Sequence, residues 1–296
     1  NPGASPALLA DLVRLGHGLL YLSRGQPVLY YGDEQGMVGR GGNDMQARED
    51  MFAAQAPDFR NAPLLATTRT GADDKFDPAH PFYLFFAKLA ALRAVHPALR
   101  TGAMLLRDSG HPGLFAFSRI ERGEKTEYLV ALNNSRREEL RAALPTSQPA
   151  GAGFKLLFDS HTGGGSDAPL VTDAAGRLVV ELAPLQFAVW RAAAPLSAAA
   201  GPLRVALVNP ADGATLTFGQ REHDGHLFPT RHELRAEVGG GDGFAEVTFV
   251  MQRASQPGQY ELLGTDDTAP YRVFWRPPPD LADGEHLTFI ATVTDL

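Results

Sequence analysis

The sequence contains no cysteine among its 296 residues, which excludes disulfide bonds and thiolate metal sites. Positive charge is also scarce, since 27 Lys and Arg face 34 Asp and Glu and the formal net charge is −7. Nucleic acids and anionic membranes select surfaces rich in Lys and Arg, so the charge argues against both as partners. No apolar run approaches the ~20 residues of a transmembrane helix, and no membrane span is expected.

The rest of the composition is ordinary for a soluble globular protein, with 44% hydrophobic and 21% charged residues. The length suits two or three domains of ~100–200 residues each. The sequence opens with Asn1 in place of Met and stops at TFIATVTDL, within a strand-like run. We therefore expect a fragment cut at both ends, in which no signal peptide is observable.

Two helices are predicted in residues 1–99. The first begins at Ser5-Pro6, a capping residue followed by proline at the first helical position, and ends at Gly25. The second is opened by Pro81 and closed by Pro97. Apolar residues at helical spacing define the expected buried faces. These are Leu8, Leu12, Leu15, Leu19 and Leu22 in the first helix, and Phe82, Phe85, Phe86, Leu89, Leu92 and Val95 in the second.

The run PVLYY, residues 27–31, lies between these helices and is apolar throughout. It predicts a strand buried on both faces, as in a parallel sheet, whose partner strands we expect upstream of Asn1. The loop that follows, from Gly32 to about Pro78, is far longer than the ~2–6 residues usual at such a connection. Because ligands gather at the carboxyl ends of parallel strands, this loop begins on the expected functional face.

From residue 100 to residue 194 the pattern changes to short β segments separated by turn residues: GLFAFSRI, EYLVALNN, FKLLFD, RLVVEL and QFAVWR. They predict an antiparallel sandwich. The Ala- and Pro-rich stretch 195–202 predicts a linker. A second strand series over 203–296 predicts a truncated immunoglobulin-like sandwich. Trp190 and Trp275 lie in strand-like runs, where we expect them in the cores.

Two adjacent carboxylates, Asp33 and Glu34, follow the predicted strand. The paired carboxylates of a glycosidase flank one bond, ~5–5.5 Å apart for retention of configuration or ~6.5–9.5 Å apart for inversion. Neighbouring residues that leave a strand point to opposite faces. We therefore expect Asp33 and Glu34 to bind loop N–H groups, and not to form a catalytic pair.

Further along the same loop, Asp44, Arg48 and Asp50 offer hydrogen bonds to a hydroxyl-rich ligand. The alternative, which spacing alone favours, is a solvated loop with a surface ion pair of little energetic value. No histidine spacing and no acidic run matches a metal-binding motif, so no metal site is predicted in this chain.

The run LLYLSRGQPVLYYGDEQGMVG resembles the segment around the last barrel strand of the α-amylase superfamily of glycoside hydrolases. Asp44-x-x-x-Arg48-x-x-Met51-Phe52 is similar to the family's Asp…Arg…Met-Trp pattern, although Phe52 stands where Trp is common, which weakens the transfer of a stacking role. HPFYLFFAKLAALRAVHPALRTG resembles the last barrel helix, and LFAFSRI, YLVALNNS and LAPLQFAVWR resemble the sandwich called domain C. The resemblance runs from about Leu8 to Arg191 and is nearest to bacterial α-amylases and pullulanase-like enzymes. The family's Gly-x-Pro turn and Tyr-Tyr-Gly-x-Glu strand end are matched by Gly25, Pro27, Tyr30, Tyr31, Gly32 and Glu34.

The resemblance implies a multidomain fold. Residues 1–99 would hold the last strand and flanking helices of a (β/α)8 TIM barrel, and 100–194 would be domain C. The strand-end structural motif would be Tyr30, Tyr31, Gly32, Asp33 and Glu34. An Asp nucleophile, a Glu acid/base and a second Asp act on strands four, five and seven in the family, which would place all three upstream of Asn1. No catalytic residue is therefore expected in this chain, and the chain alone is predicted to be inactive.

The implied function is retaining hydrolysis of α-glucans such as starch, maltooligosaccharides or pullulan, with Asp44, Arg48 and Asp50 as candidate substrate-binding residues. An extracellular or periplasmic location is implied. No cofactor is expected in this chain, since family members bind structural calcium through segments mostly absent here. The alternative is a non-catalytic carbohydrate-binding or spacer module. The sequence leaves open α-1,4 against α-1,6 specificity, hydrolysis against transglycosylation, and the oligomeric state.

Overall fold

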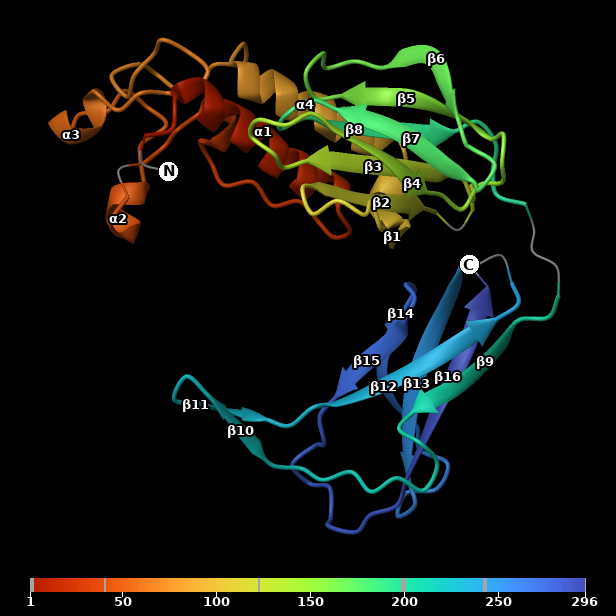
Figure 1. The fold of residues 1–296 in the computed structure, drawn as a ribbon. Coiled ribbons are helices and arrows are strands. Elements are labelled where there is room, and N and C mark those ends of the chain that lie inside the picture. Colours follow the sequence, from red (N-terminus) through yellow and green to blue (C-terminus); the bar gives the residue numbers. More distant parts are fainter. Residues whose placement is uncertain (1–2, 40, 122, 198–200, 242–243, 296) are drawn as a thin grey trace. The chain divides into compact units, whose positions relative to one another are not determined.

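A computed structural model describes residues 3–39, 41–121, 123–197, 201–241 and 244–295 (Figure 1). The chain divides into two compact units, Asn1–Pro195 and Leu196–Leu296. The described helices and strands β1–β8 belong to the first unit, and strands β9–β16 belong to the second. Residues 198–200 of the predicted 195–202 linker lie outside the described residues.

The two long helices begin where the sequence predicts. Ser5 Oγ caps the first by accepting a hydrogen bond from Leu8 N (3.2 Å), and His80 Nδ1 caps the second by accepting from Phe82 N (3.1 Å). Each helix has proline in its first turn, where the missing N–H breaks no helical bond. The helical elements are α1 (Pro6–Leu22), η1 (Asp33–Gln35), α2 (Asp44–Ala47), α3 (Pro57–Arg60), α4 (Pro81–Val95) and α5 (Ala98–Thr101).

The leucine stripe predicted as the buried face of α1 is wrong in part, because Leu19 is 40% exposed and only Leu22 is fully buried. The helix buries Ala10, Gly18 and Tyr21 instead. A Cβ on Gly18 would lie 2.3 Å from the ring of Phe187, so the absent side chain is what lets the helix approach the sheet. On α4 the buried apolar residues are Phe82, Phe85, Phe86 and Leu89, as predicted, whereas Val95 is 71% exposed.

The strand predicted at 27–31 is also wrong. Residues 26–30 have no regular secondary structure, and Val28 and Tyr30 are 78% and 54% exposed. A strand needs a neighbour for its backbone hydrogen bonds, and none of the five sheets formed by the described residues includes this segment. Those residues therefore contain no complete barrel.

The strands of the first unit are antiparallel, as the sequence predicts. Six of them form one sheet in the order β1-β2-β3-β8-β5-β6, and β4 pairs with β7. The prediction misses β1, β4 and β6. The strands are β1 (Ala103–Arg107), β2 (Leu114–Ile120), β3 (Glu127–Asn133), β4 (Leu140–Pro145), β5 (Gly153–Asp159), β6 (Ser166–Val171), β7 (Arg177–Leu182) and β8 (Phe187–Ala192).

Both faces of the six-stranded sheet are covered, which explains why β3 is buried at every position. Leu129 and Ala131 share a core with residues of β4 and β7. Tyr128, Val130 and Leu132 alternate with them and share a second core with residues of α1 and α4. The helices therefore pack on the face of the sheet opposite to the β4–β7 pair.

The second unit encloses its own core between two three-stranded antiparallel sheets, β15-β12-β9 and β14-β13-β16. Its strands β10 and β11 form a separate hairpin. Trp275 is buried here and Trp190 in the first unit, as predicted for both. The strands are β9 (Arg204–Asn209), β10 (Gln220–His223), β11 (His226–Pro229), β12 (His232–Gly239), β13 (Ala245–Arg253), β14 (Glu261–Asp266), β15 (Tyr271–Trp275) and β16 (Leu287–Asp295).

Candidate functional site

Two buried arginines fix the exit of α1, from which the candidate site begins. Arg93 of α4 donates from Nη1 to the carbonyl of Tyr21 (2.7 Å) and from Nη2 to that of Gly25 (2.5 Å). Arg119 of β2 is fully buried and donates to the carbonyl of Leu22 (2.8 Å). These cations lie at the C-terminal end of the helix, where the carbonyls lack helical partners and the helix dipole is negative. Burial, together with the nearby charge of Arg100, lowers the pKa of Arg93.

Tyr30 and Tyr31 follow this turn with their ring centroids 4.7 Å apart and both side chains largely exposed. The backbone then reverses at Gly32 and Gly36, whose φ angles of 92° and 68° favour glycine. A Cβ on Gly36 would lie 2.5 Å from the carbonyl oxygen of Leu65, whose own N–H donates to the Gly36 carbonyl (2.9 Å). The start of the loop, at Gly36, is thus packed against the later loop segment that contains Leu65.

The two candidate carboxylates face different partners. Glu34 Oε2 accepts a hydrogen bond from Gly32 N (3.0 Å), which is the loop N–H contact expected for it. Asp33 Oδ2 lies 3.5 Å from Nε2 of His17 on α1. Neither contact directs both carboxylates toward one point, where a glycosidic bond would have to lie.

His17 is the partner that sequence reasoning missed for Asp33. Its ring stacks on Phe86 at 4.2 Å, and its Nδ1 donates to the Val13 carbonyl (2.9 Å). Burial by itself lowers the pKa of His17. The hydrogen bond and negative charge of Asp33, together with the Val13 carbonyl, outweigh burial and raise the pKa above its ordinary value.

Asp44, Arg48 and Asp50 lie together on the exposed side of the loop. Arg48 Nη2 is 2.6 Å from Asp44 Oδ2 across one turn, and these side chains are 55% and 73% exposed. The pKa of the Tyr31 phenol is raised above its ordinary value, mainly by partial desolvation and by Tyr30. The negative charge of Asp50 also raises this pKa, and the positive charge of Arg48 opposes the rise. Arg48 and Asp50 are therefore both within electrostatic reach of Tyr31. An exposed pair of this kind stabilises the fold little, so its charges remain accessible to a ligand.

A fully buried lysine organises the loop from below. Lys75 Nζ donates to the carbonyl oxygens of Asp50 (2.7 Å), Phe52 (3.0 Å) and Gly71 (3.4 Å), and its backbone N–H donates to Met51 O (2.9 Å). An ammonium taken out of water is stable only when its donors are satisfied, and here backbone carbonyls satisfy them. Asp50 and Phe52 are consequently held by their main chain while their side chains stay exposed.

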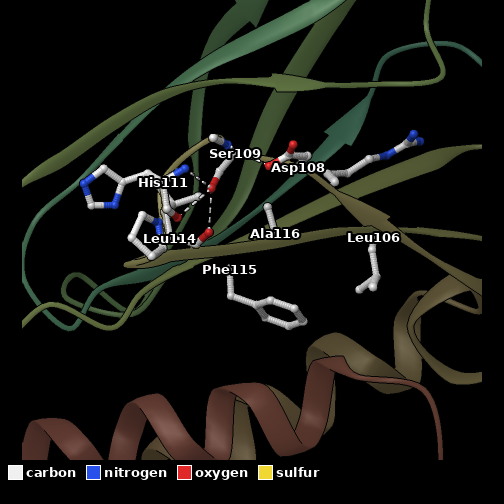
Figure 2. A pocket seen from close by; sticks show the side chains of 10 residues that line it. Leu106, Asp108, Ser109, His111, Leu114, Phe115 and Ala116 are labelled. Atoms are coloured by element: carbon white, nitrogen blue, oxygen red, sulfur yellow. Dashed lines mark hydrogen bonds between the residues drawn. The ribbon is translucent and has the colours of Figure 1, made fainter.

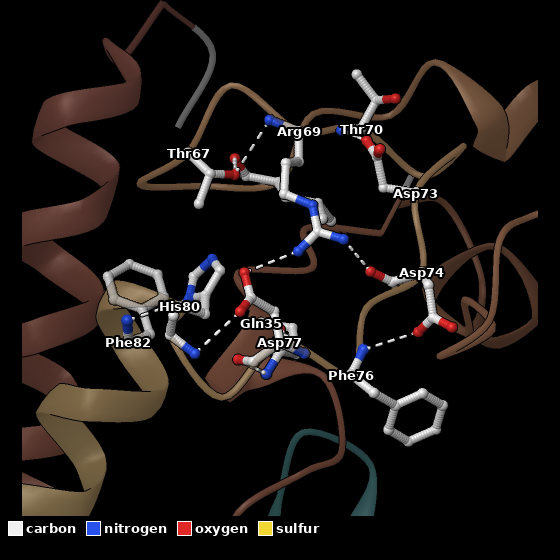
Figure 3. A network of polar contacts seen from close by, with 12 residues as sticks. Gln35, Thr67, Arg69, Thr70, Asp73, Asp74, Phe76, Asp77, His80 and Phe82 are labelled. Atoms are coloured by element: carbon white, nitrogen blue, oxygen red, sulfur yellow. Dashed lines mark hydrogen bonds and ion pairs between the residues drawn. The ribbon is translucent and has the colours of Figure 1, made fainter.

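A second network of polar contacts holds the chain around Asp77 (Figure 3). Gln35 of η1 is buried and clamps Asp77, accepting from its N–H (3.3 Å) and donating to its carbonyl (3.1 Å). Arg69 pairs with the Asp77 carboxylate (2.8 Å) and also donates to the carbonyl of Asp74. The sequence carries no local signal for Gln35 or Lys75, because Gln35 binds Asp77 and Lys75 binds the carbonyl of Asp50, which are 42 and 25 residues away along the chain.

One surface depression of about 650 Å³ lies elsewhere, on the β1–β2 hairpin (Figure 2). Leu106 and Phe115 line it on one side of the hairpin, and Ser109 Oγ closes the turn by donating to the carbonyls of His111 and Leu114. None of the site residues predicted from the sequence lines this depression.

The part of the chain that the structure describes holds no cluster of three or more His, Cys, Asp or Glu placed to bind a metal ion. A search of the same residues finds no helix long and apolar enough to cross a membrane. The expectation that this chain needs no cofactor stays a prediction.

The chain is 37% identical to the α-amylase of Streptomyces lividans over 295 residues, which is 99% of this chain and 29% of that protein. It is 31% identical to the β/α-amylase of Paenibacillus polymyxa over 148 residues, 48% of this chain and 9% of that protein. The chain thus spans less than a third of the length of these relatives. No family model matches it. Among solved structures, the trehalulose synthase MutB from Pseudomonas mesoacidophila MX-45 is 20% identical with a TM-score of 0.42, covering 62% of this chain and 38% of that chain.

Proposed function

The chain belongs to the α-amylase superfamily of glycoside hydrolases, and we propose that it is the C-terminal portion of an enzyme that hydrolyses α-glucans with retention of configuration. The observation that carries the proposal is the 37% identity to the S. lividans α-amylase along 99% of the chain. Starch, maltooligosaccharides and pullulan are the proposed substrates. The proposed location, which rests on the likeness to bacterial α-amylases, is extracellular or periplasmic.

The proposed role of this chain is to position substrate and not to cleave it. Asp33 and Glu34 are engaged with His17 and Gly32, which supports placing the Asp nucleophile, the Glu acid/base and the second Asp in the part of the enzyme that this chain does not span. Arg48 and Asp50 would hydrogen-bond sugar hydroxyls, with Asp44 holding the guanidinium of Arg48.

The proposed domain division assigns residues 1–99 to the end of the barrel, 100–194 to domain C and 203–296 to an immunoglobulin-like module. For the second unit we also propose a non-catalytic role as a carbohydrate-binding or spacer module. Its separate core favours that role, because such a unit folds without the catalytic part.

The proposed activity is tested by reducing-sugar release from starch, pullulan and maltooligosaccharides. The longer enzyme is expected to act on at least one of them and to give the α-anomer first in proton NMR, because two displacements retain configuration. A β-anomer would contradict retention, and no turnover on any of the three would contradict the function. The 296-residue chain alone is expected to show no turnover. Activity of this chain that is lost on Asp33→Asn or Glu34→Gln would show that the pair is catalytic.

A further inference from the structure

Two phenylalanine rings meet on the surface of the loop although they come from separate stretches of it. Phe52 and Phe76 are 67% and 58% exposed, their ring centroids are 5.2 Å apart, and their planes are inclined by 62°. The Phe76 ring points away from the polar network beside it (Figure 3). Exposed aromatic surface loses the free energy of burial, so a rigidly held exposed pair indicates a surface that contacts something else.

The polar contacts below the rings hold both backbones in place. Lys75 holds the backbone of Phe52, because its buried ammonium donates to the Phe52 carbonyl at 3.0 Å. Phe76 lies between Lys75 and Asp77, which Gln35 and Arg69 clamp, and its own N–H donates to Asp74 Oδ1 at 3.0 Å. Ordering both rings in advance lowers the entropy that a ligand would lose on binding them.

We propose that Phe52 and Phe76 form a stacking platform for an α-glucan chain, with Lys75 as the positioning residue beneath it. The inference rests on the proposed function and names the part of the site that holds the polymer. Aromatic rings bind the C–H faces of pyranoses, and the exposed carboxylate of Asp50 lies two residues from Phe52 to accept from hydroxyls.

The angle between the rings sets the expected selectivity. Successive units of an α-1,4-glucan are rotated relative to each other because the chain bends at each linkage, whereas a β-1,4-glucan is extended and flat. Two faces inclined by 62° suit the bent chain. The platform is therefore expected to bind maltoheptaose and to discriminate against cellohexaose.

The test is affinity electrophoresis of the 296-residue chain in gels containing starch, with maltoheptaose or cellohexaose as soluble competitor. Phe52→Ala and Phe76→Ala are each expected to raise the dissociation constant for starch about 3- to 10-fold, the scale of one aromatic contact. Phe52→Trp should bind at least as tightly as the parent. Phe115→Ala is the matched control, because Phe115 of β2 is also an exposed phenylalanine (40%) of the first unit but lies outside the loop.

The positioning role of Lys75 is tested by a double-mutant cycle. Lys75→Met is expected to weaken binding as much as Phe52→Ala does, and to add little further loss in the Phe52→Ala background. Additive losses would overturn the positioning role, since a purely structural effect would act independently of the ring.

Unchanged binding of both alanine variants, equal competition by cellohexaose, or no retardation of the parent chain would overturn the platform. These outcomes are distinct from failure of the proposed function. If the longer enzyme hydrolyses starch while this chain binds none, the platform is wrong and the function stands. If Phe52→Ala and Phe76→Ala weaken starch binding by this chain and the longer enzyme hydrolyses no α-glucan, the platform stands as a binding site and the function is wrong.

Discussion

The six-stranded sheet and the loop from Pro27 to His80 obtain their order in different ways. The sheet is held by backbone ladders, and apolar side chains cover both of its faces. In its described residues, 27–39 and 41–80, the loop has one isolated bridge, at Pro63 and Thr70, and its helices are only three or four residues long. Its backbone is held by side chains of the loop itself that bind backbone groups of other loop segments, such as Lys75 and Gln35.

This difference matters for function because a loop residue can have a fixed backbone while its side chain remains exposed to solvent. In the sheet, a residue is ordered because its side chain is buried, and a buried side chain cannot contact a ligand. In the loop, carbonyl groups are held from below while Tyr31, Arg48 and Phe52 keep their side chains exposed. Single substitutions that remove a contact from the sheet or from the loop test this comparison, and their expected effects on stability range from large in the sheet to small in the loop.

The largest effect is expected for Phe187→Ala in β8. Phe187 is fully buried between Phe85 and Phe158 and fills the space against Gly18. Its truncation should lower the free energy of unfolding by about 3–5 kcal/mol, because a cavity forms where helices and sheet meet. Urea denaturation measures the change. Phe115→Ala on β2, where the ring is 40% exposed, is the control and should have a much smaller effect.

Arg119→Met is expected to have the next largest effect. The buried guanidinium donates to the carbonyl of Leu22, at the end of α1, and to that of Gly102, at the end of α5, and both carbonyls would lose these donors. A loss of roughly 2–3 kcal/mol in unfolding free energy follows. Arg100→Met is the control, since Arg100 also donates to a helix-end carbonyl, that of Ala94, but on the surface. Equal losses for the two variants would show that burial of the cation is irrelevant.

The same contrast explains what the sequence could and could not predict. Helix α4 is found because proline at its start and phenylalanines at helical spacing are local signals. The run 27–31 reads as a strand but forms none, because strand formation depends on a neighbour that sequence pattern does not supply. Strand β6 is not predicted, because it is exposed at every position and its sequence therefore shows no alternation of apolar and polar residues.

The candidate site divides in a similar way. Asp44 and Arg48 are candidates because their spacing matches a family pattern, and Asp50 is one because its carboxylate can bind hydroxyl groups; the structure places Arg48 beside Asp44 and both Arg48 and Asp50 within electrostatic reach of Tyr31, and their contact with substrate stays a prediction. Lys75 is not found, because its three acceptors are backbone carbonyls, which any residue carries. The leucines of α1 mislead for a further reason. A single glycine, Gly18, decides which face of the helix can approach the sheet.

A smaller effect, with a defined pH dependence, is expected at the contact between α1 and the loop. Asp33 raises the pKa of His17 in the folded state, so this group stabilises the fold fully below its unfolded pKa of ~6.5. That contribution is lost as the pH rises through the higher folded pKa. His17→Gln should therefore lower the melting temperature relative to the parent more at pH 5.5 than at pH 8.5.

His80 provides the opposite case for comparison. Burial lowers its pKa, only partly opposed by the bond to the Leu65 carbonyl and the charge of Asp77, so the folded state favours the neutral ring. Its contribution is present above pH ~6.5 and is lost as the pH falls through the lower folded pKa. Melting curves of His80→Gln should accordingly fall below the parent more at pH 8.5 than at pH 5.5. The same pH trend in both variants would contradict these assignments.

The smallest effect on stability, and the one that bears most directly on function, is expected for Arg48→Ala. The guanidinium is 55% exposed and pairs with Asp44 across one turn, so the free energy of unfolding should change by less than ~1 kcal/mol. Arg141→Ala is a matched control, because Arg141 lies 3.9 Å from Glu181 in an equally exposed pair on the β4–β7 strands. In the longer enzyme, loss of a charged hydrogen bond to substrate should lower kcat/KM for α-glucans about tenfold or more. Steady-state kinetics on maltooligosaccharides should show this loss for Arg48→Ala and not for Arg141→Ala. Unchanged kinetics of Arg48→Ala, or a large fall in its stability, would show that Arg48 forms only an ordinary ion pair with Asp44. The loop would then have an ordered backbone but no demonstrated contact with substrate.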